Sequence, residues 1–243
     1  MFLSISKNTA RIFLLSKLFL LPPKSFTGQS GIAVIINKLG LIQHDPLNIC
    51  GRNVDLVLQA RVNDIHPDGY FDWLYKEKRG IECYDKELCI VPIGDLPLCL
   101  QMTVNTGRQK RFKGFLSKYQ KDIDVLLAKI DKDGPVCSID IKNSQKVHVF
   151  WQDDKWGRAV LDTLWRQGQL VIAKRENGRK YYDLPKKVYG AKFIIIDGKT
   201  KISPCHILRR IKAVGMLPKS ATGQGWLGIG VGRDILPIVN DMI

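Results

Sequence analysis

A short stretch in the second half of the chain predicts a helix that is followed by a tight β-hairpin. Residues 157–168 carry apolar side chains at helical spacing, and residues 170–184 form two extended arms around the pair Asn177-Gly178. Asn-Gly is the strongest short-range signal for a two-residue hairpin, because both central residues of a type I′ turn need positive φ. A helix followed by such a hairpin is the pattern of a winged helix.

The predicted hairpin, or wing, is basic. It carries Lys174, Arg175, Arg179 and Lys180 around the acidic Glu176. We expect these four side chains to contact a phosphate backbone or a groove of DNA, because lysine and arginine are the usual partners of phosphate oxygens. The alternative is that a charged hairpin tip serves only solubility.

The overall charge points to the same class of partner. The chain holds 38 Lys and Arg against 23 Asp and Glu, a formal net charge of +15. Since neutralisation of phosphates drives nucleic-acid affinity, a globular chain this basic favours a nucleic-acid partner. An anionic membrane surface would instead require a long apolar run or a strongly basic amphipathic helix, and neither is evident. We therefore expect no membrane partner.

The N-terminal segment and the cysteines predict a cytoplasmic protein. The apolar run 11–21 is interrupted by Lys17 and ended by Pro22-Pro23. It has about half the length that a bilayer requires, which indicates an amphipathic helix of a soluble protein. The six cysteines show no Cys-x-x-Cys pair, so we interpret them as reduced thiols in a reducing compartment. The histidines match no metal-ligand spacing either, and we expect no metal and no cofactor.

Periodicity and turn residues predict a mainly α fold with small β-hairpins, of the α+β class. Helices are expected over 4–21, 30–38, 54–62, 68–78, 118–130, 157–168, 205–215 and from 234 onward, and short strands over 41–43, 89–93 and 147–151. The apolar pattern of residues 54–62 also fits a strand, and a helix is the preferred interpretation. A basic run at 106–113 includes Arg108, Lys110 and Arg111. This run is either a DNA contact or a solvated linker or helix face.

Several segments, in one order along the chain, resemble a known family. Residues 39–52, LGLIQHDPLNICGR, and residues 55–61, DLVLQAR, resemble the signature of the winged-helix DNA glycosylases of the AlkZ and YcaQ type. The resemblance covers nearly the whole chain, since it continues in FDWLY at 71–75, IVPIGD at 90–95, the stretch 156–182 and the stretch 208–215. Members of this family excise bulky alkylpurines and unhook interstrand crosslinks, so the resemblance implies a DNA repair enzyme.

The family's catalytic motif falls on Gln43-His44-Asp45. In the family this element is Gln, a usually aliphatic residue, then Gln or Asp, and the Asp form resembles the YcaQ branch. The resemblance implies that Asp45 stabilises a developing oxocarbenium ion and aims a water at C1′, while Gln43 holds that water. The alternative for Asp45 is structural, because Asp-Pro is an ordinary turn starter. Arg52 matches a further family position, where it contacts a phosphate, braces Asp45 or forms an ordinary salt bridge.

The sequence departs from the family pattern at three points. His44 replaces the aliphatic middle residue, Asp85 stands where the family commonly has histidine, and the β-barrel that follows the third winged helix in the family is absent. The resemblance divides the chain into a first winged-helix unit with the Gln-x-Asp motif at 1–99, a second unit with the basic wing at 100–197 and an incomplete third unit at 198–243. We therefore expect a C-terminally truncated relative.

The resemblance implies a monofunctional DNA glycosylase that hydrolyses the N-glycosidic bond of alkylated purines and unhooks interstrand crosslinks. We expect it to act as a monomer on double-stranded DNA with alkylated or crosslinked bases. Because helix-plus-wing units are common in regulators, the alternative is a non-catalytic winged-helix DNA-binding protein or transcriptional regulator. A structural or protein-interaction fragment is a third reading, against which the net charge argues.

Overall fold

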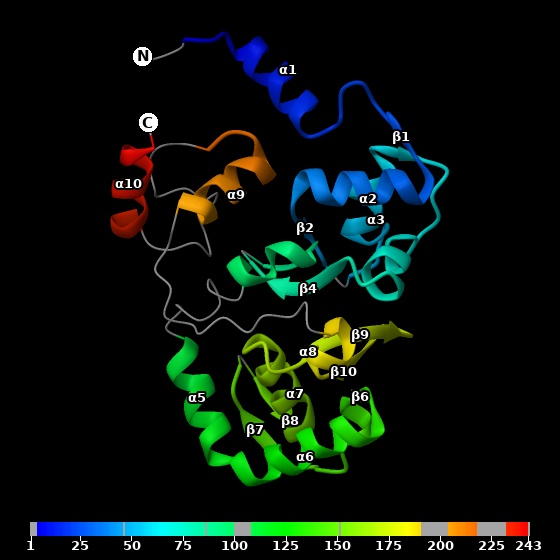
Figure 1. The fold of residues 1–243 in the computed structure, drawn as a ribbon, viewed down its shortest axis with the longest axis vertical. Helices are drawn as coiled ribbons and strands as arrows, with labels where there is room; N and C mark the ends of the chain where they lie inside the picture. Colours follow the sequence, from blue (N-terminus) through cyan, green and yellow to red (C-terminus); the bar gives the residue numbers. More distant parts are fainter. Residues whose placement is uncertain are drawn as a thin grey trace.

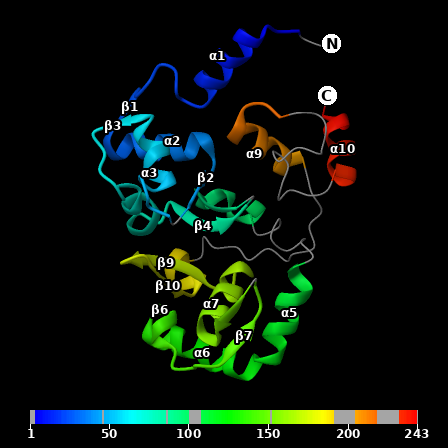
Figure 2. The same ribbon diagram turned by 180° about the vertical axis from the view of Figure 1, so that it is seen from behind.

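The computed structural model describes residues 4–45, 47–85, 87–99, 108–150, 152–190, 204–217 and 232–242. Two α/β units lie one above the other, and two C-terminal helices lie beside the first unit (Figures 1 and 2). An N-terminal helix, α1 (Lys7–Lys17), lies at the outer edge of the first unit and has no buried residue. The predicted mainly α fold with small sheets is confirmed.

The first unit has the element order of a winged helix. Its first helix, α2 (Gly28–Leu39), buries Ile32, Ile35 and Ile36 and ends at Gly40, which adopts the left-handed conformation at φ 76°. The elements that follow are β2 (Ile42–Gln43), α3 (Asn53–Gln59), the π-helical turn η1 (Asp72–Lys76), β4 (Gly80–Tyr84) and β5 (Leu88–Pro92). The strands form an antiparallel sheet in the order β2-β5-β4. The hairpin of β4 and β5 is thus the wing of the first unit.

The second unit repeats this order. It contains α5 (Arg108–Lys118), α6 (Gln120–Asp133), β6 (Val136–Cys137), the 3-10 turn η3 (Ser138–Asp140), α7 (Trp156–Arg166), β9 (Val171–Glu176), β10 (Arg179–Asp183) and α8 (Pro185–Tyr189). A small hairpin, β7 (Lys146–His148) and β8 (Asp153–Lys155), lies between η3 and α7. The sheet order β6-β10-β9 corresponds strand by strand to β2-β5-β4. The prediction of tandem winged-helix motifs is therefore confirmed.

The predicted turn of the second wing is present. Asn177 and Gly178 both have positive φ, at 49° and 76°, and connect β9 to β10 with Glu176 opposite Arg179. Positive φ at both central residues is what a type I′ turn requires. The predicted hairpin is confirmed, with its turn at the expected residues.

The structure differs from the expected elements at several boundaries. Strand β4 was not predicted, because a buried acidic residue, Glu82, interrupts its apolar pattern. The helix expected over 54–62 ends at Gln59, since Val62 pairs in β3 (Val62–Asn63) with β1 (Phe26–Thr27). The N-terminal helix stops at Lys17 rather than continuing to residue 21, because Phe19 has a φ of 58°.

The last described helices are α9 (Pro204–Val214) and α10 (Gly232–Asp241), where the sequence predicted helices over 205–215 and from 234. The expected domain boundaries at 99/100 and 197/198 fall at or within stretches outside the described ranges, so this division of the chain stays a prediction. Residues 106–107 of the basic run also lie outside the described ranges. In the described ranges, no helix combines the length and the apolar character that a membrane crossing requires.

Candidate active site

The Gln-x-Asp segment alternates between solvent and interior. The side chain of Gln43, at the end of β2, is exposed, the next residue, His44, is buried, and Asp45 is half-buried. Side chains two positions apart along an extended segment project to the same side. Gln43 and Asp45 therefore share the outer side of the segment, and His44 points inward.

Hydrogen bonds hold the backbone on both sides of Asp45. The His44 amide donates to the carbonyl of Leu88 at 2.7 Å, which extends the pairing with β5. Asn53, the first residue of α3, donates its side-chain amide to the carbonyl of Gln43 at 2.7 Å. The Leu47 amide donates to Asp45 Oδ1 at 2.9 Å, which leaves Oδ2 for another partner. Among the described residues, no cation forms an ion pair with Asp45, so its charge is uncompensated.

Beneath this segment lies a buried carboxylate, Glu82 of β4. His44 Nδ1 is 3.2 Å from Glu82 Oε2, and because an ionised carboxylate only accepts, Nδ1 must carry the hydrogen. Arg175 of β9 donates from Nε and from its terminal nitrogen to the two oxygens, at 2.8 and 2.6 Å. The Tyr75 hydroxyl is a further donor to Oε1. A single carboxylate thus joins the Gln-x-Asp segment, η1 and the second wing.

Its partners keep Glu82 ionised. Burial by itself raises the pKa of a carboxyl, but here the hydrogen bonds from Arg175 and His44 outweigh burial and hold the pKa of Glu82 well below its usual range. The backbone carbonyl of the same residue accepts from the Trp165 indole at 3.2 Å. Glu82 is therefore an anchor between the two units, in the region where β4 and β9 lie side by side (Figures 1 and 2).

This arrangement corrects one expected DNA contact. The side chain of Arg175 is only 8% exposed and turns into the interior, where its Nε and one terminal nitrogen donate to Glu82. A guanidinium buried in this way is not accessible to a phosphate. Arg175 is a structural residue of the interface between the units, and its assignment to the DNA surface was wrong.

The other three cations of the second wing differ in whether they have an acidic partner. Lys174 pairs with Glu176 at 2.7 Å, and Lys180 pairs with Asp162 at 3.0 Å and lies over the Trp165 ring. Arg179, beside the turn, is exposed and has no acidic partner in the part of the chain that the structure describes. Most of the wing's charge is thus compensated within the protein, and its tip is the part available to a polyanion.

The remaining expected DNA contacts are also placed. Arg52 pairs with Asp68 and lies over the Phe71 ring, which is the salt-bridge alternative, and it does not pair with Asp45. Arg111 of α5 is exposed, and its guanidinium lies 3.5 Å from the Val149 carbonyl. Arg108 and Lys110 belong to the same helix, but their side chains lie outside the described part.

The helix before the second wing is not available to a groove. Eight of the eleven residues of α7 are buried, and its last turn packs on the first unit through Trp165, which contacts both Glu82 and Tyr84. In a regulator of the winged-helix type, the corresponding helix enters the major groove. In this structure α7 cannot enter a major groove, because it is covered by the protein.

Two functional features escaped the sequence reasoning. Glu82 could have been suspected, since a carboxylate within an otherwise apolar run must have partners if it is buried. Asp85, which stands where the family commonly has histidine, is buried and pairs with both Arg209 and Arg210 of α9. No local signal predicts this contact, because the partners lie more than a hundred residues away along the chain.

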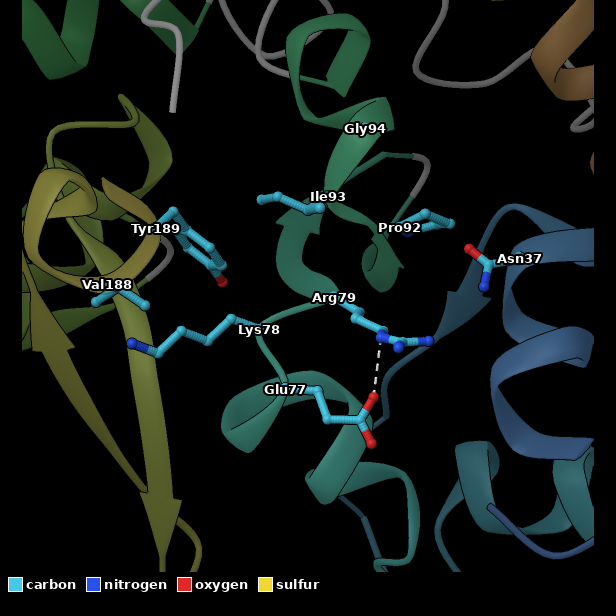
Figure 3. Close-up of a pocket in the computed structure, with 9 residues that line it drawn as sticks. All are labelled: Asn37, Glu77, Lys78, Arg79, Pro92, Ile93, Gly94, Val188 and Tyr189. Carbon is cyan, nitrogen blue, oxygen red and sulfur yellow. Dashed lines mark ion pairs between the residues drawn. The ribbon is translucent and has the colours of Figure 1, made fainter. Parts of the chain in front are cut away.

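A separate cleft of about 610 Å³ lies at the base of the first wing (Figure 3). Lys78 extends toward Val188 of α8, and Arg79 pairs with Glu77 at 2.9 Å. Pro92 lines the cleft and lies three residues beyond Cys89, the residue of β5 that pairs with Gln43. Three residues correspond to about 10 Å along a strand. The cleft is therefore distinct from the surface formed by the Gln-x-Asp segment. Within the described ranges, no group of three His, Cys, Asp or Glu residues is placed to hold a metal ion.

Two comparisons relate this chain to known proteins. Residues 36–233 match the profile of a protein family described as DNA glycosylase AlkZ-like. The fold is similar to the solved structure of the Streptomyces sahachiroi DNA glycosylase AlkZ, with a TM-score of 0.68 and 13% sequence identity. The match covers 99% of this chain and 66% of that one, so this chain spans slightly less than two thirds of the neighbour's length. At this identity the structural match concerns the fold alone.

Proposed function

Because the chain belongs to the AlkZ-like DNA glycosylase family, we propose that it hydrolyses the N-glycosidic bond of alkylated purines in duplex DNA, with Asp45 and Gln43 as its catalytic residues. The observation that carries this proposal is that Gln43 and Asp45 lie on one side of the Gln-x-Asp segment, where the half-buried Asp45 carboxylate has no cationic partner among the described residues. An unpaired carboxylate is free to meet a cation supplied by the substrate.

The chemistry suits this pair. A purine alkylated at N7 carries a positive charge, so it leaves as a neutral base when the bond to C1′ breaks and the sugar becomes an oxocarbenium ion. Asp45 stabilises that cation and accepts a proton as water adds to C1′. Gln43 both donates and accepts, which suits it to hold the water. The products are a free base and an abasic site, and the strand itself stays intact.

Binding of the duplex is assigned to the free cations. Arg179 at the wing tip and Arg111 on α5 are exposed and are proposed to contact phosphates, as are Arg108 and Lys110. Lys174, Lys180 and Arg52 already have acidic partners, so a phosphate would have to replace those partners. We propose that the chain acts as a monomer, and that interstrand crosslinks are substrates because Gln43 faces open solvent rather than an enclosed pocket.

The test is excision of N7-methylguanine from a duplex, scored as alkali-labile sites. The Asp45→Asn variant keeps the acceptor oxygen for the Leu47 amide but loses the charge, and Asp131→Asn, at an exposed position of α6, is its matched control. We expect Asp45→Asn to lower the excision rate by about 10²- to 10⁴-fold, the range of general acid–base catalysis. The control should retain full activity. Equal rates for Asp45→Asn and the parent would refute the assignment.

The competing function is DNA binding without catalysis. The buried α7 disfavours it, since a regulator of this fold reads the major groove with that helix. Salt-dependent binding without release of base from methylated or crosslinked duplex, in the parent as well as in Asp45→Asn, would establish the competing function instead.

A further inference from the structure

Two large apolar side chains stand in solvent directly after Asp45. The side chain of Leu47 is 65% exposed and that of Ile49 is 91% exposed, which makes Ile49 the most exposed large hydrophobic residue in the part of the chain that the structure describes. Leu56 of α3, 41% exposed, lies beneath the same loop. A single exposed apolar residue is ordinary on a protein surface, but a cluster beside a functional site indicates an interaction surface.

The loop that carries these side chains is held at both of its ends. At the start, the Leu47 amide is bound by Asp45 Oδ1 at 2.9 Å. At the far end, Gly51 adopts a φ of 128° and lies against Leu56, where an added Cβ would come within 2.9 Å of that side chain. The loop thus presents Ile49 outward from two attached ends, and the first attachment is the carboxylate of the motif itself.

The position of the loop identifies its partner. For Asp45 to reach C1′ of a nucleotide, the neighbouring chain must lie against the duplex, and the apolar part of a duplex is its base stack. Architectural DNA-binding proteins insert leucine, isoleucine and similar side chains between base steps, and enzymes acting on bases must unstack the target. Resting on the proposed function, we propose that Leu47 and Ile49 form an apolar wedge that enters the base stack beside the nucleotide attacked at Asp45.

The wedge is tested by two readouts on the same duplex. One strand of the duplex carries N7-methylguanine. On the opposite strand, the base adjacent to the cytosine that pairs with this lesion is 2-aminopurine, whose fluorescence rises when it is unstacked. We expect the parent to raise the fluorescence on binding. Ile49→Ser should lose this rise and excise the base at least about 10-fold more slowly, the lower end of what burial of one isoleucine contributes. Ile49→Phe, which keeps an apolar side chain, should retain both signals.

The chain offers a matched control. Ile139 in η3 is 61% exposed on the second unit, so Ile139→Ser removes a similar apolar side chain from a different surface and should change neither readout. A lesion placed in an already unstacked bulge should also narrow the difference between the parent and Ile49→Ser, because the wedge has less stacking to disrupt. A uniform loss of affinity would not depend on the substrate in this way.

The outcomes separate the wedge from the proposed function. If the parent raises the fluorescence, Ile49→Ser does not, and no base is excised, the wedge stands and the glycosylase assignment fails. If the parent excises the base but Ile49→Ser matches it in both readouts, the wedge is overturned and the assignment stands. A parent that leaves the fluorescence unchanged, or an effect of Ile49→Ser confined to self-association in sedimentation, also overturns the wedge.

Discussion

Truncation of Arg175 should destabilise the protein far more than truncation of any other cation of the second wing. The Arg175→Met variant removes two charge-assisted hydrogen bonds, at 2.8 and 2.6 Å, from a carboxylate whose side chain is fully buried. Breaking a buried pair by removing one partner costs about 3–5 kcal/mol, because the other charge stays in the interior without compensation. His44 and Tyr75 still donate to Glu82, so we expect the lower half of that range.

Urea unfolding at pH 7 measures this difference. The matched control is Arg179→Met on the same hairpin, which removes an equal charge from an exposed position and should change the free energy of unfolding by no more than about 0.5 kcal/mol. A third variant, Arg175→Met with Glu82→Leu, replaces both partners by apolar groups and should recover part of the loss. A cost below about 1 kcal/mol for Arg175→Met, or no recovery in the double variant, would refute the role of this pair as an anchor.

Three further predictions follow from the same structure. Because the pKa of Glu82 is lowered on folding, its contribution to stability is complete above the ordinary glutamate pKa of about 4.3 and is lost as the pH falls through the lowered value; urea unfolding between pH 7 and pH 3 should show a weaker loss of stability in Glu82→Gln than in the parent. Arg179→Ala should weaken duplex binding and lower the slope of log K against log salt by up to about 1, and an unchanged slope in titrations from low to high salt would remove the wing tip from the DNA surface. Cys50 and Cys205 are exposed, whereas the other cysteines are buried, and burial raises the pKa of Cys89 to about 12. Iodoacetamide at pH 8 should therefore label Cys50 and Cys205 rapidly. If mass spectrometry finds Cys89 labelled as fast, the result contradicts this arrangement.

Local rules were sufficient for most of the helices and for the turn of the second wing. The Asn177-Gly178 turn follows from the φ angles that its two residues tolerate, and the end of α2 follows from Gly40. Both are properties of a few neighbouring residues. The same holds for the alternation of Gln43, His44 and Asp45, which follows from the two-residue period of an extended chain.

Local rules did not predict which charged residues are buried, which form ion pairs and which are free. Lys174, Arg175, Arg179 and Lys180 are alike in sequence, yet one is buried, two are paired at the surface and one is free. The partner of Lys174 is Glu176 in the same strand, but the partners of Arg175 and Lys180 lie in β4 and α7. A count of positive charges therefore overstates the surface that is available to DNA.

The sequence alone determined most of the helices, the wing turn and the side of the strand on which Gln43 and Asp45 project, because these depend on backbone geometry over a few residues. Only the tertiary structure decided that α7 is covered, that Arg175 and Asp85 are interior ion-pair residues and that Ile49 is left in solvent. Each of these depends on which surfaces come together when distant parts of the chain pack. Burial and charge pairing are properties of that packing and are not encoded in any short stretch of the chain.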